Sequence, residues 1–306
     1  MTGTPVTQSP LDIFSQYKFL NPSIFGYSYS AFKDRYAVMG GFGGYEVIGY
    51  NHVDELKSRM YKVAIRYEKE DCVTLPDKVY MERVYDLSSE QKKHYDSVYN
   101  EFMTNINSIE ISANFMAAKL LKLSQICSGF IIDKDKKIHY IDGNKKLEAL
   151  GEIIDEVYPK KIIIWCHFIG EINLVRKYLD DRKCKYSILH GDIAQEDRMK
   201  EINKFQTDPD VKFFIGQISA GGYGINLTAA SYVIYFGHTY SLEQRLQSAD
   251  RCHRIGQKNK VTYIDMIGDK TLERSILNIL KKKKSISDVV TKKNFAVIAR
   301  GGYYAA

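Results

Sequence analysis

Short apolar runs alternate with amphipathic stretches between about residues 160 and 280. Runs such as KIIIWC, VKFFI and YVIYF are rich in β-branched and aromatic residues, which is typical of strands buried on both faces. The stretches between them place apolar residues three or four positions apart, which predicts helices. Strands and helices in this order predict an α/β fold with a parallel sheet and helices on both faces. The expected strands are 161–166, 186–189, 211–215, 232–236 and 261–267, and the expected helices are 171–179, 195–205, 242–253 and 272–280.

The first 150 residues follow a less regular pattern. Residues 88–102 and 111–127 have the apolar spacing of helices, and the polar residues 133–146 predict a surface excursion. A glycine-dense stretch, GGFGGY at 40–45, predicts a hairpin or a loop. A phosphate-cradling role is the weaker interpretation of this stretch, because no lysine follows the glycines as it does in a P-loop.

Composition and charge narrow the class of protein. Hydrophobic residues make up 44% of the 306 residues, which is enough for a packed core. The formal net charge of +7 favours a polyanion partner such as nucleic acid, although an ordinary solvated basic surface has the same charge. No apolar run reaches the roughly 18–20 residues that a membrane span needs, so no membrane partner is expected. The five cysteines form no C-x-x-C pair, which favours a reducing, cytoplasmic compartment over a disulfide framework or a zinc site.

One stretch, QSADRCHRIGQ at 247–257, brings together side chains suited to phosphate. On the predicted helix, Gln247, Arg251 and Arg254 lie at i, i+4 and i+7 and share one face. Guanidinium groups stay protonated and match phosphate oxygens in pairs. A salt-bridged surface helix is the alternative, since Asp250 precedes Arg254 by four residues. The glycine-rich AGGYGIN at 220–226, which lies between two predicted strands, favours the phosphate interpretation because glycines allow close approach of a ligand.

These stretches resemble motifs of a known family. QSADRCHRIGQ resembles motif VI of the superfamily-two helicases of the Swi/Snf type, and AGGYGINLTAA at 220–230 resembles motif V. KIIIWCHF at 161–168 resembles motif IV, KKLEAL at 145–150 the entry to the second RecA-like lobe, and TGTP at 2–5 motif III of the first lobe. The resemblance implies a RecA-like fold in two domains. Residues 1–68 would be the remnant of a first lobe with its linker, and residues 69–306 the second lobe with a mainly helical insertion at about 88–140.

The resemblance also implies roles for individual residues by their motif positions. Arg251 and Arg254 are implied to be arginine fingers, which stabilise the phosphoryl group during ATP hydrolysis. The residues implied to lie near the nucleotide are Gln247, Gly222, Gly224 and Asn226, and those implied to couple nucleotide state to DNA grip are Thr2, Gly3 and Thr4. The residues implied to face the backbone of duplex DNA are Cys166, His167, Gln217 and Ser219. Backbone contacts of this kind predict binding without base-sequence preference.

The chain contains neither a G-x-x-x-x-G-K-[ST] loop nor a DExH-type motif. Because the family uses both to hold ATP and Mg²⁺, we expect a fragment whose partner is the missing N-terminal RecA-like lobe, with no ATPase activity of its own. A non-hydrolysing module that binds DNA or a partner is the alternative. An unrelated α/β hydrolase is disfavoured by the absence of a G-x-S-x-G motif. The compact chain, rich in Lys, Asn and Tyr, suggests a prokaryotic or phage source.

Overall fold

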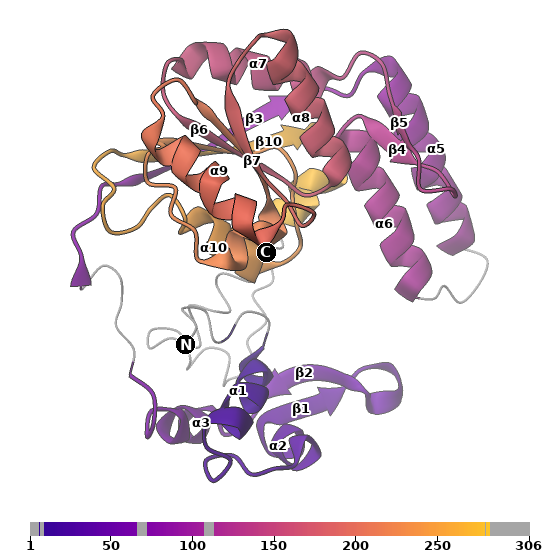
Figure 1. The fold of residues 1–306 in the computed structure, drawn as a ribbon. Helices are drawn as coiled ribbons and strands as arrows, with labels where there is room; N and C mark the ends of the chain where they lie inside the picture. The colour runs from indigo at the N-terminus through magenta and orange to yellow at the C-terminus, as the bar shows by residue number, and fades with distance from the viewer. Residues whose placement is uncertain (1–5, 7–8, 66–71, 107–112, 279, 282–306) are drawn as a thin grey trace. The chain divides into compact units, whose positions relative to one another are not determined.

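The structure is a computed structural model that describes residues 6, 9–65, 72–106, 113–278 and 280–281. The chain divides into two compact units, one within residues 1–72 and the other spanning residues 73–278 (Figure 1). Thr2, Gly3 and Thr4 lie outside the described residues. Within the described residues, no helix is long and apolar enough to cross a membrane.

The larger unit is built on a six-stranded parallel sheet, which confirms the predicted α/β fold class (Figure 1). Its strand order is β3-β10-β9-β6-β8-β7, so consecutive strands are joined by crossovers that carry helices. The strands are β3 (Lys78–Tyr85), β6 (Ile162–Cys166), β7 (Tyr186–Leu189), β8 (Phe213–Gln217), β9 (Tyr232–Tyr235) and β10 (Val261–Gly268). All five strands predicted between residues 160 and 280 are therefore present.

Alternating side chains of the central strands enter two separate cores. Ile162, Ile164 and Cys166 of β6 pack in the core that includes α7 (Lys145–Val157) and α8 (Ile169–Asp181). Ile163 and Trp165 of the same strand pack in the other core, which includes α9 (Gln195–Thr207). Because both faces of the sheet are covered, a strand in its middle has no polar position, which explains the unbroken run IIIWC.

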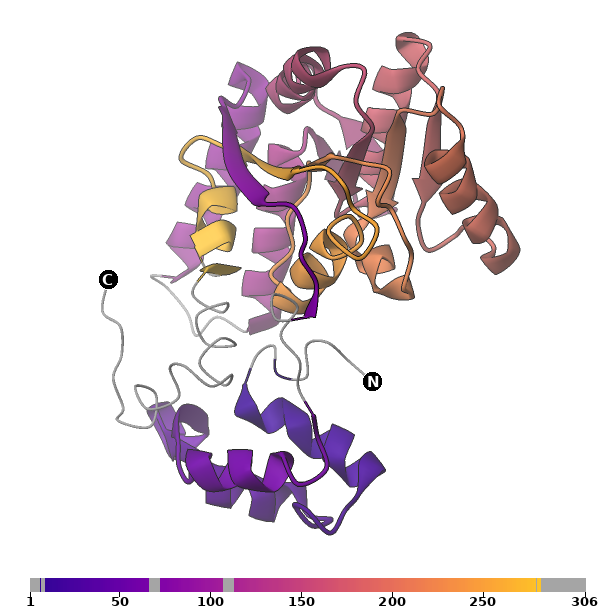
Figure 2. The same cartoon turned by 90° about the vertical axis from the view of Figure 1, so that its left-hand side faces the viewer.

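A helical pair and a short hairpin follow β3 in the region predicted to be an insertion (Figure 1), and in Figure 2 the strand β3 lies in front of the pair. The pair consists of α5 (Ser89–Ile106) and α6 (Ala113–Cys127), and the hairpin of β4 (Phe130–Ile132) and β5 (Ile138–Tyr140). Gln91 is fully buried where the pair joins the lobe. Its amide donates to the carbonyl of Ile126 over 2.9 Å and accepts from the amide of Ser88 over 3.1 Å. These bonds hold the start of α5 against the end of α6.

The smaller unit packs three short helices around an aromatic cluster. The helices are α1 (Ile13–Leu20), α2 (Tyr29–Tyr36) and α3 (Val53–Met60), and the buried rings include Phe14, Tyr17, Phe32 and Tyr36. The glycine-dense stretch joins β1 (Ala37–Gly40) to β2 (Glu46–Tyr50) as an antiparallel hairpin, one of the two forms predicted for it. Gly41, Gly43 and Gly44 there have φ of 74°, 75° and 75°, a region that favours glycine.

The helix predicted at 242–253 is shorter than expected. α10 (Leu242–Ala249) begins after Ser241, whose hydroxyl accepts from the amide of Gln244, and it ends at Ala249. The carbonyl of Ala249 accepts a hydrogen bond from the Tyr263 hydroxyl over 2.9 Å, and the carbonyl of Arg251 accepts from the amide of Leu227 over 2.9 Å. Beyond Ala249 the backbone continues in turns, in which the amides of Arg251 and Cys252 donate to carbonyls three residues earlier. The single helical face predicted for Gln247, Arg251 and Arg254 is therefore wrong.

Candidate functional site

One segment, residues 217–230, runs from the carboxyl ends of the parallel strands to their amino ends. We call these two sides of the sheet the carboxyl edge and the amino edge. The segment leaves the carboxyl end of β8 at Gln217 and returns just before Tyr232, where β9 begins at the amino edge. Its first part is the short 3₁₀ helix η3 (Ile218–Tyr223), and Gly224 follows with a φ of 68°. A positive φ of this kind favours glycine, so the turn out of η3 depends on Gly224. The segment thus has one end at each edge of the sheet.

At the amino edge, the end of this segment is bonded to the arginine turn, which we define as residues 250–257. The amide of Leu227 donates to the Arg251 carbonyl over 2.9 Å, and the Arg254 guanidinium donates to the Ile225 carbonyl over 3.3 Å. The His253 ring lies 2.7 Å from the carbonyl of Pro76, just before β3. The two stretches that resemble motifs V and VI are therefore joined in three dimensions.

Arg251 and Arg254 are close enough for their charges to interact. Partial burial lowers the pKa of Arg251, the nearby charge of Arg254 lowers it further, and Asp250 opposes the shift. Two guanidinium groups that repel each other in a partly desolvated place favour an anion with several charges. The side chains of both arginines are half-buried, so part of each reaches the surface.

The other residues expected near a nucleotide lie on α10 or in segment 217–230. Gln247 lies on α10, where its amide donates to the Glu243 carboxylate over 2.9 Å. Asn226 is exposed, and its side-chain oxygen accepts from the amide of Thr228 over 3.3 Å. Gly222 lies within η3, and Gly224 ends it. Their role towards a nucleotide stays a prediction.

The carboxyl edge brings together three of the four residues expected to face DNA. The amide of Gln217 donates to the His167 carbonyl and accepts from the backbone amide of Gly191, both over 3.4 Å. Ser219, two residues further on, is exposed. Cys166 differs, because its side chain is fully buried in the core beside α7 and α8. A thiol in that position does not reach the surface, so the expectation that Cys166 contacts DNA is corrected.

His167 is held at this edge by a buried carboxylate. The backbone amides of His167 and Phe168 donate to Glu171 over 2.6 and 3.1 Å at the start of α8. Burial lowers the pKa of the His167 imidazole, Glu171 opposes this shift and His238 adds to it. The ring is therefore neutral near pH 7 and suits hydrogen bonding more than charge attraction.

Sequence reasoning missed the ion pair that anchors α10. The Arg245 guanidinium bonds both oxygens of Asp265 on β10, over 2.6 and 2.9 Å. The same group lies 3.2 Å from the ring centre of Tyr235, and the Tyr235 hydroxyl lies 3.0 Å from that of Ser248. The signal for this pair was an acidic residue within the otherwise apolar strand VTYIDMI, because a buried carboxylate requires a cation.

Reversing this ion pair tests whether it anchors α10. We expect Arg245→Glu or Asp265→Arg alone to lower the free energy of unfolding by about 2 kcal/mol or more, since each leaves like charges facing one another. The double variant is expected to recover most of the loss. Urea unfolding followed by the fluorescence of Trp165 measures it, because this tryptophan is the only one in the chain and lies in the sheet core. Losses that simply add in the double variant would contradict the pairing.

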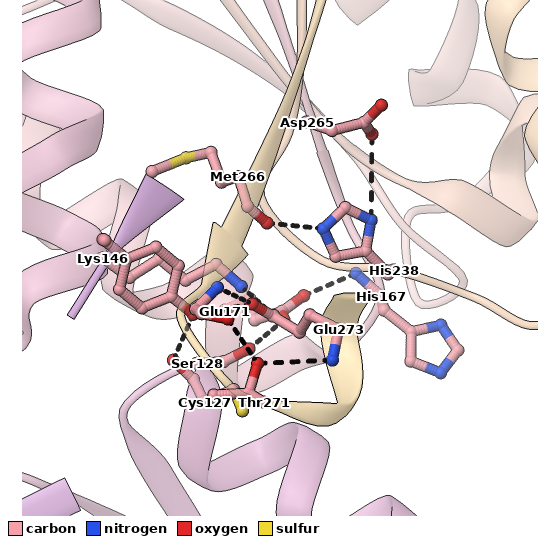
Figure 3. A network of polar contacts seen from close by, with 12 residues as sticks. Cys127, Ser128, Lys146, His167, Glu171, His238, Asp265, Met266, Thr271 and Glu273 are labelled. Carbon is pink, nitrogen blue, oxygen red and sulfur yellow. Dashed lines mark hydrogen bonds and ion pairs between the residues drawn. The ribbon is translucent and has the colours of Figure 1, made fainter. Parts of the chain in front are cut away.

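A buried polar network joins α7, β10 and the helical insertion (Figure 3). The ammonium of Lys146 lies 2.6 Å from Glu273, and the side chains of both are buried. Glu273 also accepts from the Tyr85 hydroxyl and the amide of Gly268, each over 2.8 Å. Figure 3 shows this pair beside Glu171, whose other oxygen accepts from Ser128. Nothing in the local sequence pattern marks these residues as charged members of the core.

Two models of known protein families match this chain. The model of the helicase conserved C-terminal domain matches residues 145–256. The model of the SNF2-related domain matches residues 1–132, which covers the smaller unit and continues through α5 and α6.

Similar proteins are ATP-dependent helicases and chromatin-remodelling factors. The chain is 26% identical to an uncharacterized ATP-dependent helicase of Mycoplasma genitalium, over 94% of this chain and 27% of that protein. It is 26% identical to the CHD3-type chromatin-remodeling factor PICKLE of Arabidopsis thaliana, over 96% of this chain and 22% of that protein. The chain thus spans about a quarter of the length of these relatives. Several further relatives are eukaryotic, as PICKLE is, so a prokaryotic or phage source is not supported.

A solved structure of similar fold contains DNA. The SWI2/SNF2 ATPase core of Sulfolobus solfataricus in complex with double-stranded DNA is 27% identical, with a TM-score of 0.59. The match covers 100% of this chain and 66% of that chain.

Proposed function

Because this chain is a C-terminal region of a superfamily-two helicase of the Swi/Snf type, we propose that it is the second-lobe half of an ATP-driven DNA translocase. The observation that carries the proposal is the bonding of the arginine turn to the end of segment 217–230. The same segment begins at the carboxyl edge beside His167. A single stretch of backbone therefore connects two arginines suited to binding phosphate with a surface suited to binding DNA.

In this proposal, Arg251 and Arg254 are arginine fingers that act on ATP held by a first lobe. Guanidinium groups stabilise the negative charge that spreads over the phosphoryl oxygens in the transition state. Gln247, Gly222, Gly224 and Asn226 would border the nucleotide from the same side. ATP supplies the free energy of translocation, and we assign its Mg²⁺ to acidic side chains of the first lobe.

The carboxyl edge would contact the DNA backbone through hydrogen bonds. Ser219 presents a hydroxyl, Gln217 an amide, and His167 a neutral imidazole, and each can donate to a phosphate oxygen. These groups do not read base edges, so binding would tolerate any base sequence. The SWI2/SNF2 core with double-stranded DNA supports duplex DNA as the partner class.

Supplying a first lobe tests the proposal directly. We expect this chain alone to hydrolyse no ATP, and a fusion to the first lobe of a Swi/Snf-type relative to hydrolyse ATP when duplex DNA is added. The alternative, a module that binds DNA or a partner without hydrolysis, predicts DNA binding but no restored activity in the fusion. Strong hydrolysis by the chain alone would contradict the two-lobe assignment.

Ser219→Ala tests the DNA surface. Losing one phosphate hydrogen bond is expected to weaken duplex binding about three- to tenfold, equally for different base sequences. Fluorescence anisotropy with labelled duplexes at two salt concentrations measures the affinity. The affinity should fall steeply with salt both in the unmodified protein and in the Ser219 variant. Thr207→Ala removes an exposed hydroxyl at the end of α9 and serves as the matched control. If the Ser219 variant and the control bind duplex DNA with equal affinity, Ser219 does not belong to the DNA-binding surface.

A further inference from the structure

Gln257 ends the stretch QSADRCHRIGQ, and its side chain is buried with only 6% exposed. Its amide nitrogen lies 2.9 Å from the Ala230 carbonyl, 3.1 Å from that of Thr228 and 3.2 Å from that of Cys252. Its oxygen accepts from the backbone amide of Asn259 over 2.9 Å. Both polar atoms of this buried side chain are therefore bonded to backbone groups, and its nitrogen also lies 3.8 Å from the Cys252 sulfur.

These bonds join two parts of the candidate site. Thr228 and Ala230 end the segment that crosses the sheet, whereas Cys252 follows Arg251 in the arginine turn. The thiol of Cys252 reinforces the junction, because it donates to the Ala230 carbonyl over 3.2 Å. The backbone amide of Gln257 also donates to the Arg254 carbonyl over 3.0 Å. One residue thus contacts the turn at Cys252, between the two arginines, and at Arg254 itself.

We propose that Gln257 is a positioning residue for Arg251 and Arg254, an inference that rests on the proposed function. The arginine turn lies beyond the last helical residue of α10, and the amides of Arg251 and Gln257 there donate to carbonyls three residues earlier, over 3.3 and 3.0 Å. A long arginine side chain is aimed only as accurately as its backbone is held. Gln257 does not itself point towards solvent, so it acts through the turn and not on ATP.

Two other glutamines provide matched comparisons. Gln206 on α9 holds the same segment from its other side, accepting from the amide of Ala229 over 2.9 Å and donating to the Thr228 hydroxyl over 3.3 Å. In the described part of the chain, its hydrogen bonds go to this segment and not to the arginine turn. Gln91 is also buried and also bonds backbone groups, but it lies in the helical insertion.

Hydrogen exchange on this chain tests the junction without any activity. We expect Gln257→Met, which keeps the length of the side chain and removes its hydrogen bonds, to speed amide exchange of Leu227 and Asn259 about tenfold. Gln91→Met should leave these amides unchanged, and Trp165 fluorescence should show that both variants are folded. Gln257→Glu keeps the shape but loses both donors, so it should speed exchange at least as much. Unchanged exchange in both Gln257 variants would overturn the positioning role.

Steady-state kinetics in the two-lobe fusion tests the consequence for catalysis. Gln257→Met is expected to lower kcat about 100-fold with little change in KM for ATP, because a misplaced arginine weakens transition-state contacts more than binding. Gln206→Met should lower kcat less, and Gln91→Met should leave it unchanged. An equal fall for Gln257 and Gln91 variants would mean a purely structural role. If the unmodified fusion hydrolyses no ATP, the proposed function fails, while the exchange result still decides whether Gln257 holds the turn.

Discussion

Replacing Arg254 with alanine is expected to slow ATP hydrolysis by about 10³–10⁵-fold in the two-lobe fusion, while duplex DNA binding persists. The guanidinium would stabilise the phosphoryl transition state at the amino edge, whereas the proposed DNA surface lies at the carboxyl edge. Arg251→Ala is expected to have an effect of the same kind, because both arginines share the turn. Phosphate release at saturating ATP and DNA measures the rate, and anisotropy measures DNA binding.

Two controls separate this chemical role from a structural one. Arg254 also donates to the Ile225 carbonyl, so Arg254→Lys, which keeps a positive charge without the planar fork, shows how much of the loss is specific to guanidinium. Arg176→Ala removes an exposed arginine of α8 and should leave the rate unchanged. If the Arg251→Ala and Arg254→Ala variants both hydrolyse ATP at the normal rate, the arginine-finger assignment is excluded.

Glu273→Gln is expected to lower the free energy of unfolding by about 3–5 kcal/mol. The substitution leaves the ammonium of Lys146 buried without its counter-charge, 4.9 Å from the ring centre of Phe236. Lys146→Met should cost a similar amount, because it leaves the carboxylate of Glu273 unpaired. The double variant, Lys146→Met with Glu273→Leu, is expected to lie closer to the unmodified protein than either single variant, since neither charge of the pair is left without its partner. Urea unfolding followed through Trp165 gives these differences.

The neighbouring lysine supplies the control. Lys145 pairs with Glu148 over 2.7 Å on the exposed side of the same helix, where both side chains are about half exposed. Lys145→Met should change the free energy of unfolding by less than about 0.5 kcal/mol, because solvent screens surface pairs. A cost for Lys146→Met as small as that for Lys145→Met would show that the buried pair does not stabilise the fold.

The same pair predicts how stability depends on pH. Burial alone would raise the pKa of Glu273, but the charges of Lys146 and His238 and bonds from Lys146 and Gly268 outweigh it and lower the pKa. Burial alone would lower the pKa of Lys146, but Glu273 and Glu171 outweigh it and raise the pKa. Stability from Glu273 is therefore lost as pH falls below its ordinary pKa of about 4.3, and stability from Lys146 as pH rises above about 10.4. The cost of Glu273→Gln should be full at pH 7 and smaller at pH 3.

Periodicity along the chain predicted strands more securely than the end of the functional helix. The five strands between residues 160 and 280 follow from apolar runs, because a sheet covered on both faces favours apolar residues in its middle strands. The spacing of Arg251 and Arg254 is equally regular, yet α10 ends before both of them. The Tyr263 hydroxyl and the Leu227 amide, which come from positions distant in the chain, bond the backbone where α10 has ended.

Buried charges were the least predictable part of the molecule. Lys146 lies among charged neighbours in KKLEAL, and nothing in its local pattern distinguishes it from the exposed Lys145. Its burial depends on Glu273, which is 127 residues away in the sequence. Cys166 shows the converse, since its place in a motif suggested a surface role while its strand position directs the thiol into the core.

The sequence by itself determined the class of this protein: a RecA-like parallel sheet, identified from apolar runs, and a Swi/Snf-type helicase region, identified from QSADRCHRIGQ and the glycine-rich stretch before it. Local patterns suffice for these because periodicity and motif order are properties of neighbouring residues. Tertiary structure alone decided that the two arginines lie in a turn and that Gln257 joins this turn to segment 217–230. The physical reason is that the hydrogen bonds concerned connect residues far apart in the chain.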